Sequence, residues 1–240
     1  VSKANSSVDY AMLEYCIRED LKLKRPRMMA VLDPIKLVID NYPEGQVEYL
    51  EAPNNMENEE LGTRKIPFSG ELYIERDDFM AEPPKKYKRL YPGNEVRLMN
   101  AYFVTCTGYE ADDDGTIRVV HCTYDPETKG GNAPDGRKVK GTIHWVEASN
   151  AGKVEVRLYE NIVDEEKGVY NKEDGSLNVN PNSLTVTSAY VEPELLKAKG
   201  YDSYQFVRNG FFCADIHDSR EGAPVFNRIV SLKSSFKLPK

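Results

Sequence analysis

The sequence has no long hydrophobic run. None of its apolar stretches approaches the roughly 18 residues of a membrane-spanning helix. The first ten residues, VSKANSSVDY, contain no apolar signal-peptide core. We therefore expect a cytoplasmic protein with no membrane partner. Hydrophobic residues still make up 40% of the 240 residues, which is enough for a folded core.

Histidine and cysteine are scarce, and neither forms a ligand or catalytic pattern. Only three histidines occur, and the four cysteines are scattered, with no CxxC pair and no histidine at zinc-ligand spacing. The motifs G-x-S-x-G, G-x-x-x-x-G-K-[ST], G-x-G-x-x-G and H-E-x-x-H are missing as well. These absences predict that this chain holds no catalytic residue, no metal and no cofactor.

An amphipathic segment opens the chain. Between residues 8 and 24 the apolar side chains recur at spacings of three and four, which predicts an α-helix. Ser7 is the expected N-cap, Asp9 lies in the first turn, and Pro26 follows the expected end. Because a lone helix needs a partner, we expect residues 1–26 to end a helical subdomain that continues outside the chain. The expected apolar face consists of Val8, Met12, Leu13, Cys16, Ile17 and Leu21.

After Pro26 the apolar period changes to two. Nine short runs are rich in Val, Ile, Tyr and Phe and are separated by Asp, Asn, Gly and Pro. This pattern predicts an all-β body of one or two antiparallel barrels, and it excludes a parallel βαβ sheet because helices do not alternate with the strands. We expect the boundary between the two barrels, if there are two, in the polar stretch 124–138. The runs are 28–42, 65–79, 95–110, 116–125, 139–148, 153–162, 183–192, 204–216 and 225–238.

One short segment is unusually basic for a chain of formal net charge -7. In KKYKR, residues 85–89, four cations surround Tyr87. A flat ring among cations suits single-stranded or looped RNA, because unstacked bases stack on the ring, for about 1–3 kcal/mol per base, while the cations meet phosphates. A solvated charge cluster explains the composition equally well.

Two further polar stretches give weaker signals. DGRKVKG, residues 135–141, is either a phosphate contact or a charged hairpin, and the composition favours the hairpin. YQFVRNGFF sets Gln205 and Arg208 in an aromatic strand. A spacing of three places them on opposite faces of a regular strand, so they can serve one site only at a bulge or a strand end.

Several stretches, taken in order, resemble the C-terminal anticodon-binding region of glutaminyl-tRNA synthetases. They include GTRKIPFSGELYIERDDF, KKYKRLYPGNEVRLMNAY, DGRKVKGTIHWV and PVFNRIVSL, and the similarity covers nearly the whole chain. RKVKGTIHWV is also similar to archaeal and eukaryotic glutamyl-tRNA synthetases, whereas YKRLYPGNEVRL resembles the glutamine enzymes.

The resemblance implies a fold of two successive antiparallel β-barrels, like those of a ribosomal protein family that binds 5S RNA, preceded by one α-helix. Residues 1–26 would end the helical subdomain, 27–135 would form the first barrel and 136–240 the second. The last strand is a candidate to return to the first barrel.

The resemblance also implies roles for single residues. Arg27, Gln205 and Arg208 resemble the residues around the middle anticodon base, and Arg89 resembles the reader of the third base. Lys88 resembles a neighbouring loop contact. The full expected RNA-binding set, with Arg97 near the first base, is Arg27, Lys86, Tyr87, Lys88, Arg89, Arg97, Gln205 and Arg208.

Two positions depart from the family's pattern. Lys86 stands where glutamine is expected in bacterial relatives, and Met99 stands where another arginine is expected two places beyond Arg97. The second departure removes a charge-assisted contact from the expected site of the first base.

The implied function is recognition of the anticodon loop of the tRNA for glutamine, as part of a monomeric class I glutamine-tRNA ligase that uses ATP. HIGH-like and KMSKS-like signatures are absent, so we expect ATP and Mg only in a catalytic domain outside this chain, and no catalysis by this chain alone. The catalytic and helical domains of the same parent chain would be its other partners. The alternatives are a general RNA-binding β-barrel, a glutamyl-tRNA synthetase anticodon domain and a protein-docking module without an RNA role.

Overall fold

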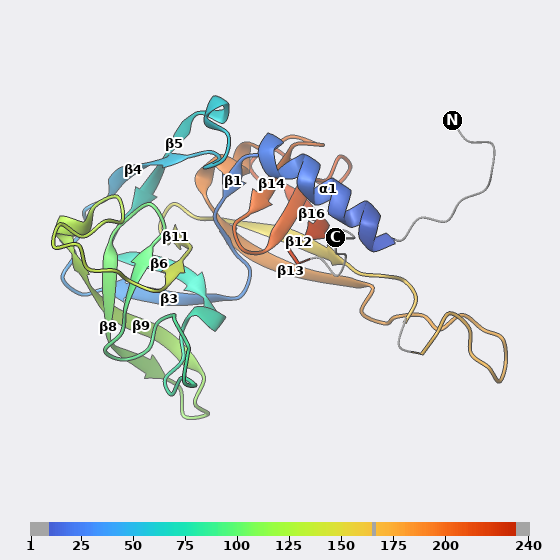
Figure 1. Cartoon of the computed structure of the whole chain (residues 1–240), viewed down its shortest axis with the longest axis horizontal. Coiled ribbons are helices and arrows are strands. Elements are labelled where there is room, and N and C mark those ends of the chain that lie inside the picture. Colours follow the sequence, from blue (N-terminus) through green and yellow to red (C-terminus); the bar gives the residue numbers. More distant parts are fainter. Residues whose placement is uncertain (1–9, 165–166, 234–240) are drawn as a thin grey trace.

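A computed structural model describes residues 10–164 and 167–233 of the chain. Within these residues it contains one α-helix and two seven-stranded sheets, each curled into a nearly closed barrel, and the barrels lie side by side (Figure 1). The prediction of an all-β body with two barrels and one preceding helix is confirmed. No helix of the described part has the length and apolar character to cross a membrane.

The strands belong to three sheets, with α1 (Tyr10–Lys24) and four short 3-10 helices between them. The first barrel has the order β10-β7-β8-β9-β3-β6-β11, with β3 (Pro34–Ile39), β6 (Glu71–Glu75), β7 (Glu95–Leu98), β8 (Phe103–Ala111), β9 (Ile117–Asp125), β10 (Thr142–Ile143) and β11 (Trp145–Glu147). The second has the order β1-β14-β15-β16-β12-β13-β2, with β1 (Arg27–Met28), β2 (Ala30–Val31), β12 (Gly152–Tyr159), β13 (Leu184–Val191), β14 (Ser203–Phe206), β15 (Gly210–Ala214) and β16 (Val225–Ser231). The remaining elements are the ribbon of β4 (Glu48–Pro53) and β5 (Thr63–Phe68), and the helices η1 (Glu59–Leu61), η2 (Arg76–Asp78), η3 (Pro126–Thr128) and η4 (Pro193–Lys197).

Each barrel is closed by two very short strands that a single residue separates. β10 and β11 lie at opposite edges of the first sheet, and only His144 stands between them. β1 and β2 lie at opposite edges of the second sheet, with only Met29 between them. Because one residue spans less than about 4 Å of chain, the two edges of each sheet must meet there.

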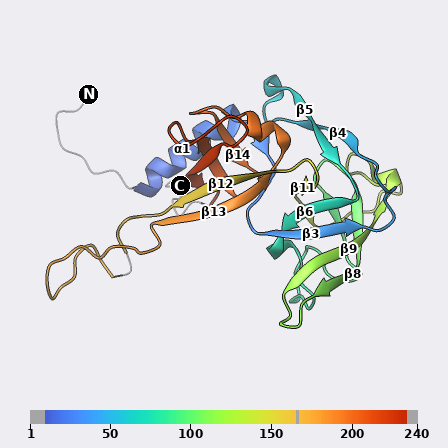
Figure 2. The ribbon, with the colours of Figure 1, turned by 180° about the vertical axis from the view of Figure 1, so that it is seen from behind.

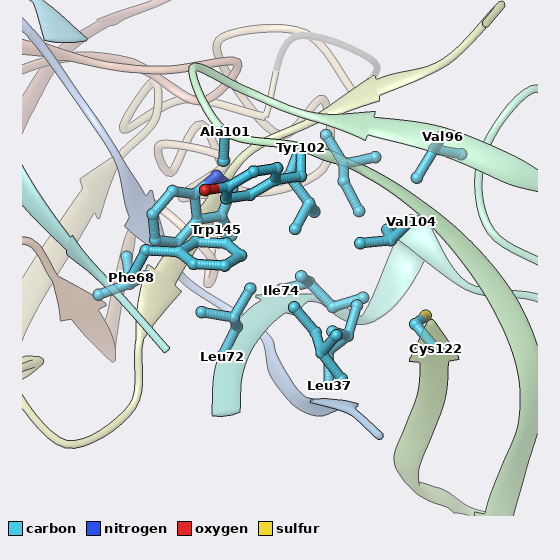
Figure 3. Close-up of a cluster of buried hydrophobic side chains, with 14 of the residues drawn as sticks. Leu37, Phe68, Leu72, Ile74, Val96, Ala101, Tyr102, Val104, Cys122 and Trp145 are labelled. Carbon is cyan, nitrogen blue, oxygen red and sulfur yellow. The ribbon is translucent and has the colours of Figure 1, made fainter. Parts of the chain in front are cut away.

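The core of the first barrel follows the predicted period of two. Along β3 the side chains alternate between half-buried and buried, which places Ile35, Leu37 and Ile39 inside. Phe68 and Trp145 meet edge to face in the same core, with ring centroids 5.1 Å apart (Figure 3). The barrel interior is therefore filled by side chains, so a ligand can bind only at the rim or on the outer surface of the barrel.

The helix α1 packs on the outside of the second barrel (Figure 2). Leu21 is buried against Phe211 and Val230, and Ile17 packs beside them. Ile17 and Leu21 of the predicted apolar face thus pack on the barrel as expected. Met12, Leu13 and Cys16 are exposed. The expected N-terminal turn with Ser7, Val8 and Asp9 lies outside the described residues.

The two sheets do not divide the chain at residue 135. Residues 142–147 carry β10 and β11 of the first barrel, and residues 27–31 carry β1 and β2 of the second. Each barrel thus needs short strands from beyond the expected boundary in order to close. The last described strand, β16, pairs with β15 and β12 of the second barrel and not with the first barrel.

Two further features of the sheets were not predicted. β4 was not among the predicted runs, because it is short, ends in a proline and buries only Leu50 and Ala52. Most pairings are antiparallel, but β1–β14, β10–β7, β12–β16 and β3–β9 are parallel, because in each pair one strand enters the sheet from a distant part of the chain.

Candidate nucleic-acid interface

A pocket between the two barrels brings three of the expected residues together. Arg27 on β1 is the register partner of Gln205 on β14. Arg208 lies just beyond the end of β14, in a turn where its backbone is left-handed with φ of 67°. All three line a cavity of about 230 Å³, opposite Met99 and Asn100 of the first barrel. Of the two arrangements that would let Gln205 and Arg208 serve one site, a bulge or a strand end, the structure has the strand end.

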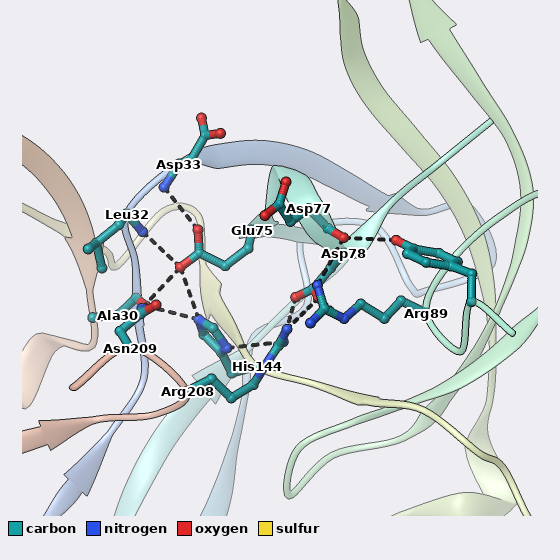
Figure 4. A network of polar contacts seen from close by, with 11 residues as sticks. Ala30, Leu32, Asp33, Glu75, Asp77, Asp78, Arg89, His144, Arg208 and Asn209 are labelled. Atoms are coloured by element: carbon teal, nitrogen blue, oxygen red, sulfur yellow. Dashed lines mark hydrogen bonds and ion pairs between the residues drawn. The ribbon is translucent and has the colours of Figure 1, made fainter. Parts of the chain in front are cut away.

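Arg208 is held by a carboxylate of the first barrel. Asp78, at the end of η2, is fully buried and accepts hydrogen bonds from Nη1 and Nη2 of Arg208, both at 2.7 Å (Figure 4). Nη1 also lies 3.4 Å from Nδ1 of His144. Burial lowers the pKa of Arg208, but the pairing with Asp78 outweighs burial and raises it. The arginine therefore keeps its charge in a half-buried site.

Arg89 meets the same carboxylate from within the first barrel. Its Nε lies 3.2 Å from Oδ1 of Asp78, and its Nη1 donates to the backbone carbonyl of Asp77 at 3.0 Å. The hydroxyl of Tyr87 donates to that carbonyl as well, at 2.8 Å. Burial and the nearby charge of Asp78 raise the pKa of Tyr87 to about 12, so the hydroxyl stays protonated and keeps donating.

A buried histidine joins the barrels beside these arginines. Nε2 of His144 lies 3.0 Å from the carbonyl oxygen of Ala30 and 3.4 Å from Oε1 of Glu75. A carbonyl only accepts and a guanidinium only donates, so Nε2 carries the ring proton and Nδ1 accepts from Arg208. Glu75 also accepts from the backbone N–H groups of residues 32–33, at 3.1 and 2.9 Å. The carboxylates of Glu75 and Asp78 and both ring nitrogens of His144 thus have hydrogen-bond partners.

A second pocket, of about 500 Å³, lies on the first barrel. Four lysines line it: Lys86 and Lys88 come from KKYKR, and Lys138 and Lys140 come from the loop before β10. The sequence favoured a solvated hairpin for residues 135–141, and no spacing rule signalled that these residues approach KKYKR. The result is a concentrated positive site in which phosphate groups can be neutralised.

Gly141 allows the two lysine segments to approach. A Cβ at this position would lie 1.9 Å from the carbonyl oxygen of Lys88, and a backbone atom cannot swing aside as a side chain can. We therefore expect Gly141→Ala to lower the free energy of unfolding by about 1–3 kcal/mol in urea denaturation. Gly108→Ala is the matched control, because a Cβ there meets nothing within 4 Å. Equal stability of the two variants would contradict the close approach.

Arg97 is not brought together with the other expected residues. It lies on β7 with its guanidinium carbon 5.3 Å from the ring centroid of Phe103, and Arg137 lies 5.4 Å from the same ring. Nε of Arg97 is buried and has no hydrogen-bond partner among the described residues. In this structure, Arg97 therefore packs against a ring and lines neither of the two pockets.

Arg64 is a pocket residue that the sequence did not signal. It comes from β5 and lines the inter-barrel pocket. Its Nε and Nη2 donate to the two carboxylate oxygens of Glu192, both at 2.6 Å, and Glu192 also accepts from the backbone N–H of Met29 at 2.6 Å. No motif marks Arg64, because its partner lies far along the chain at the start of η4.

The two pockets are lined by charged groups, planar hydrogen-bonding groups and aromatic rings. Within residues 10–164 and 167–233, no three His, Cys, Asp or Glu side chains are placed to hold a metal ion. Guanidinium and amide groups can bond base edges at two points, and lysines can neutralise phosphates. This arrangement fits an unstacked, single-stranded nucleic acid better than a continuous duplex.

The chain is similar to parts of known class I tRNA synthetases. Residues 26–125 and 142–215 match two family models, each described as "tRNA synthetases class I (E and Q), anti-codon binding domain". Relatives named glutamine–tRNA ligase are 52% identical in Clostridium kluyveri, 54% in Clostridium perfringens and 50% in Bradyrhizobium diazoefficiens. These alignments cover 100%, 99% and 98% of this chain but only 43%, 43% and 42% of the relatives. The chain therefore spans about two fifths of their length.

Proposed function

The chain belongs to the anticodon-binding domain family of class I tRNA synthetases (E and Q), and from this premise we propose that it recognises the anticodon loop of the tRNA for glutamine. The inter-barrel pocket is the observation that carries the proposal. Arg27, Gln205 and Arg208 place two guanidinium groups and one planar amide around a cavity of about 230 Å³. Such a pocket suits one unstacked base, whose edge offers acceptors and donors.

The proposed roles of the residues follow the two pockets. The inter-barrel pocket takes the middle base, and Arg89 reads the third base beside it. Lys86 and Lys88 contact the loop backbone together with Lys138 and Lys140, which line the same pocket. Tyr87 supplies a ring in the same segment, and Arg97 contacts the first base.

For the whole protein, we propose a cytoplasmic, monomeric glutamine-tRNA ligase that joins glutamine to its tRNA using ATP. This chain would be its C-terminal, anticodon-reading part, packed against the catalytic and helical domains of the same parent chain. ATP and Mg would bind in the catalytic domain and not in this chain. The names of the relatives and the share of their length that the chain covers support this proposal.

The test is a titration of the chain with a labelled glutamine anticodon stem-loop and with the same loop carrying A in place of its middle U. We expect the change to weaken binding about 5- to 150-fold, because a good bidentate contact contributes about 1–3 kcal/mol of discrimination. Raising the salt should weaken both complexes alike, by about 0.7 log units per log salt for each phosphate contacted.

Two substitutions locate the effect. Arg27→Ala should reduce the preference for the middle U, whereas Lys153→Ala, which removes an exposed cation from β12, should leave it unchanged. Equal affinity of the wild-type chain for both loops would contradict base reading and would leave a phosphate-holding barrel. Absence of binding at low salt would contradict RNA recognition by this chain.

A further inference from the structure

One buried carboxylate is shared by two arginines that come from different barrels. Asp78 is 0% exposed, and both of its oxygens bond Arg208 of the second barrel at 2.7 Å. Oδ1 also lies 3.2 Å from Nε of Arg89 in the first barrel. Figure 4 shows Asp78 between the two guanidinium groups. These two arginines are the proposed readers of adjacent bases.

The bonds to Asp78 leave part of Arg208 available for a ligand. A guanidinium has five N–H donors, and Arg208 uses three of them, two toward Asp78 and one toward His144. The Nε–H and the second Nη2–H remain, and no described residue accepts from Nε. These two donors lie on the same side of the guanidinium and form a second fork. Because Arg208 lines the inter-barrel pocket, this fork can serve a base held there.

We propose that Asp78 is a positioning residue that fixes the free fork of Arg208 relative to the guanidinium of Arg89, so that the two arginines read their bases as one unit. The proposal rests on the proposed function. If a base of the wrong shape draws Arg208 out of place, two charge-assisted bonds to a buried carboxylate break. Asp78 then pairs with Arg89 alone, and Arg89 shifts as well. A wrong base at one position thereby also weakens recognition of the base at the other position.

The neighbouring acid offers a matched contrast within the same 3-10 helix. Asp77 is exposed, and it meets Arg89 through its backbone carbonyl and not through its carboxylate. Asp77→Asn therefore removes the same formal charge as Asp78→Asn at the adjacent position and leaves both arginines held. If the two variants differ in base preference, the cause is therefore the position of the lost carboxylate and not the change in net charge of the chain.

The experiment uses four labelled stem-loops: the glutamine loop, the loop with its middle base changed, the loop with its third base changed, and the loop with both changes. For the wild-type chain we expect a preference of about 5- to 150-fold at each position. Asp78→Asn should lower both preferences together, to less than about 5-fold, and should keep the salt dependence, because the lysines are untouched. Asp77→Asn should behave as the wild type.

The outcomes separate this inference from the function on which it rests. A wild-type chain without base preference would overturn the proposed function. A wild-type chain with preference, together with an Asp78→Asn variant that melts at the same temperature and keeps both preferences, would overturn only the role of Asp78.

A second pair of variants keeps the test decisive if Asp78→Asn does not fold. Arg89→Lys keeps the charge but loses the guanidinium geometry, and it should weaken the preference at the middle base, which Arg208 reads. Arg208→Lys should likewise weaken the preference at the third base. If each substitution affects only its own base, the two arginines act independently and the proposal is wrong.

Discussion

Replacing Arg64 by alanine is expected to lower the free energy of unfolding by about 3–5 kcal/mol. Among residues 10–164 and 167–233, the substitution leaves the carboxylate of Glu192, which is 2% exposed, with the backbone N–H of Met29 as its one partner. An unpaired buried charge is costly because water no longer solvates it and no cation replaces the water. Urea denaturation followed by circular dichroism measures the effect.

Two further variants show that the pairing, and not a general loss of positive charge, causes this effect. Lys65→Ala removes a cation from the next position of β5, where the side chain is exposed, and should change stability by less than about 0.5 kcal/mol. Glu192→Gln combined with Arg64→Ala should recover part of the loss, because no buried charge then remains. If Arg64→Ala is as stable as Lys65→Ala, the buried ion pair contributes nothing to the fold.

The stability contributed by Glu75 should disappear in acid. Burial raises the pKa of Glu75, but the hydrogen bond from His144 and the backbone N–H groups of residues 32–33 outweigh it and hold the pKa at about 2, against an ordinary 4.5. Because the folded pKa lies below the unfolded one, the contribution is present above about pH 5 and is lost as the pH falls toward about 2. The shift corresponds to about 3 kcal/mol.

Comparison with Glu75→Gln isolates this contribution from the other carboxyl groups. The variant should be less stable than the wild type near neutral pH, and the difference between them in urea denaturation should shrink between about pH 5 and about pH 3. Glu71→Gln is the control on the same strand, because the Glu71 side chain is largely exposed and pairs with Lys36 at the surface. A difference between wild type and Glu75→Gln that does not change with pH would contradict the lowered pKa.

The regular part of the fold could be predicted because burial imposes a short-range pattern. The alternation on β3 marks Ile35, Leu37 and Ile39 as core residues, and the helix ends before Pro26 as expected. The strands that close the barrels carry no such pattern, because two residues are too few to show a period. β2 and β10 lie inside the expected runs 28–42 and 139–148, but their separation into short closing strands, and with it the mixing of residues between the two barrels, became visible only in the structure.

The structure brings the expected residues Arg27, Gln205 and Arg208 together at one pocket, and at the other it adds two lysines that the sequence did not indicate. A bulge or a strand end was required for Gln205 and Arg208, and the structure has a strand end there. Lys138 and Lys140 could not be assigned to the second pocket, because only the approach of Gly141 to the backbone of Lys88 brings them near KKYKR.

The carboxylates that hold the arginines were also missed. Asp78 and Arg208 are 130 residues apart in the chain, and nothing in ERDDF or YQFVR refers to the other segment. Spacing rules describe neighbours along a helix or strand, whereas these pairs form only when two barrels are packed together.

The place of β1 and β2 in the chain determines which barrel can complete its sheet first during synthesis. β1 and β2 precede the whole first barrel in the chain, yet their partners β14 and β13 follow it. The first barrel can therefore assemble while the edges of β1 and β2 are still without their strands, and such unpaired edges are open to wrong pairing with other chains. Until Gln205 has been synthesised, Arg27 has no neighbour in the sheet, so the pocket between the barrels is among the last parts of the molecule to form.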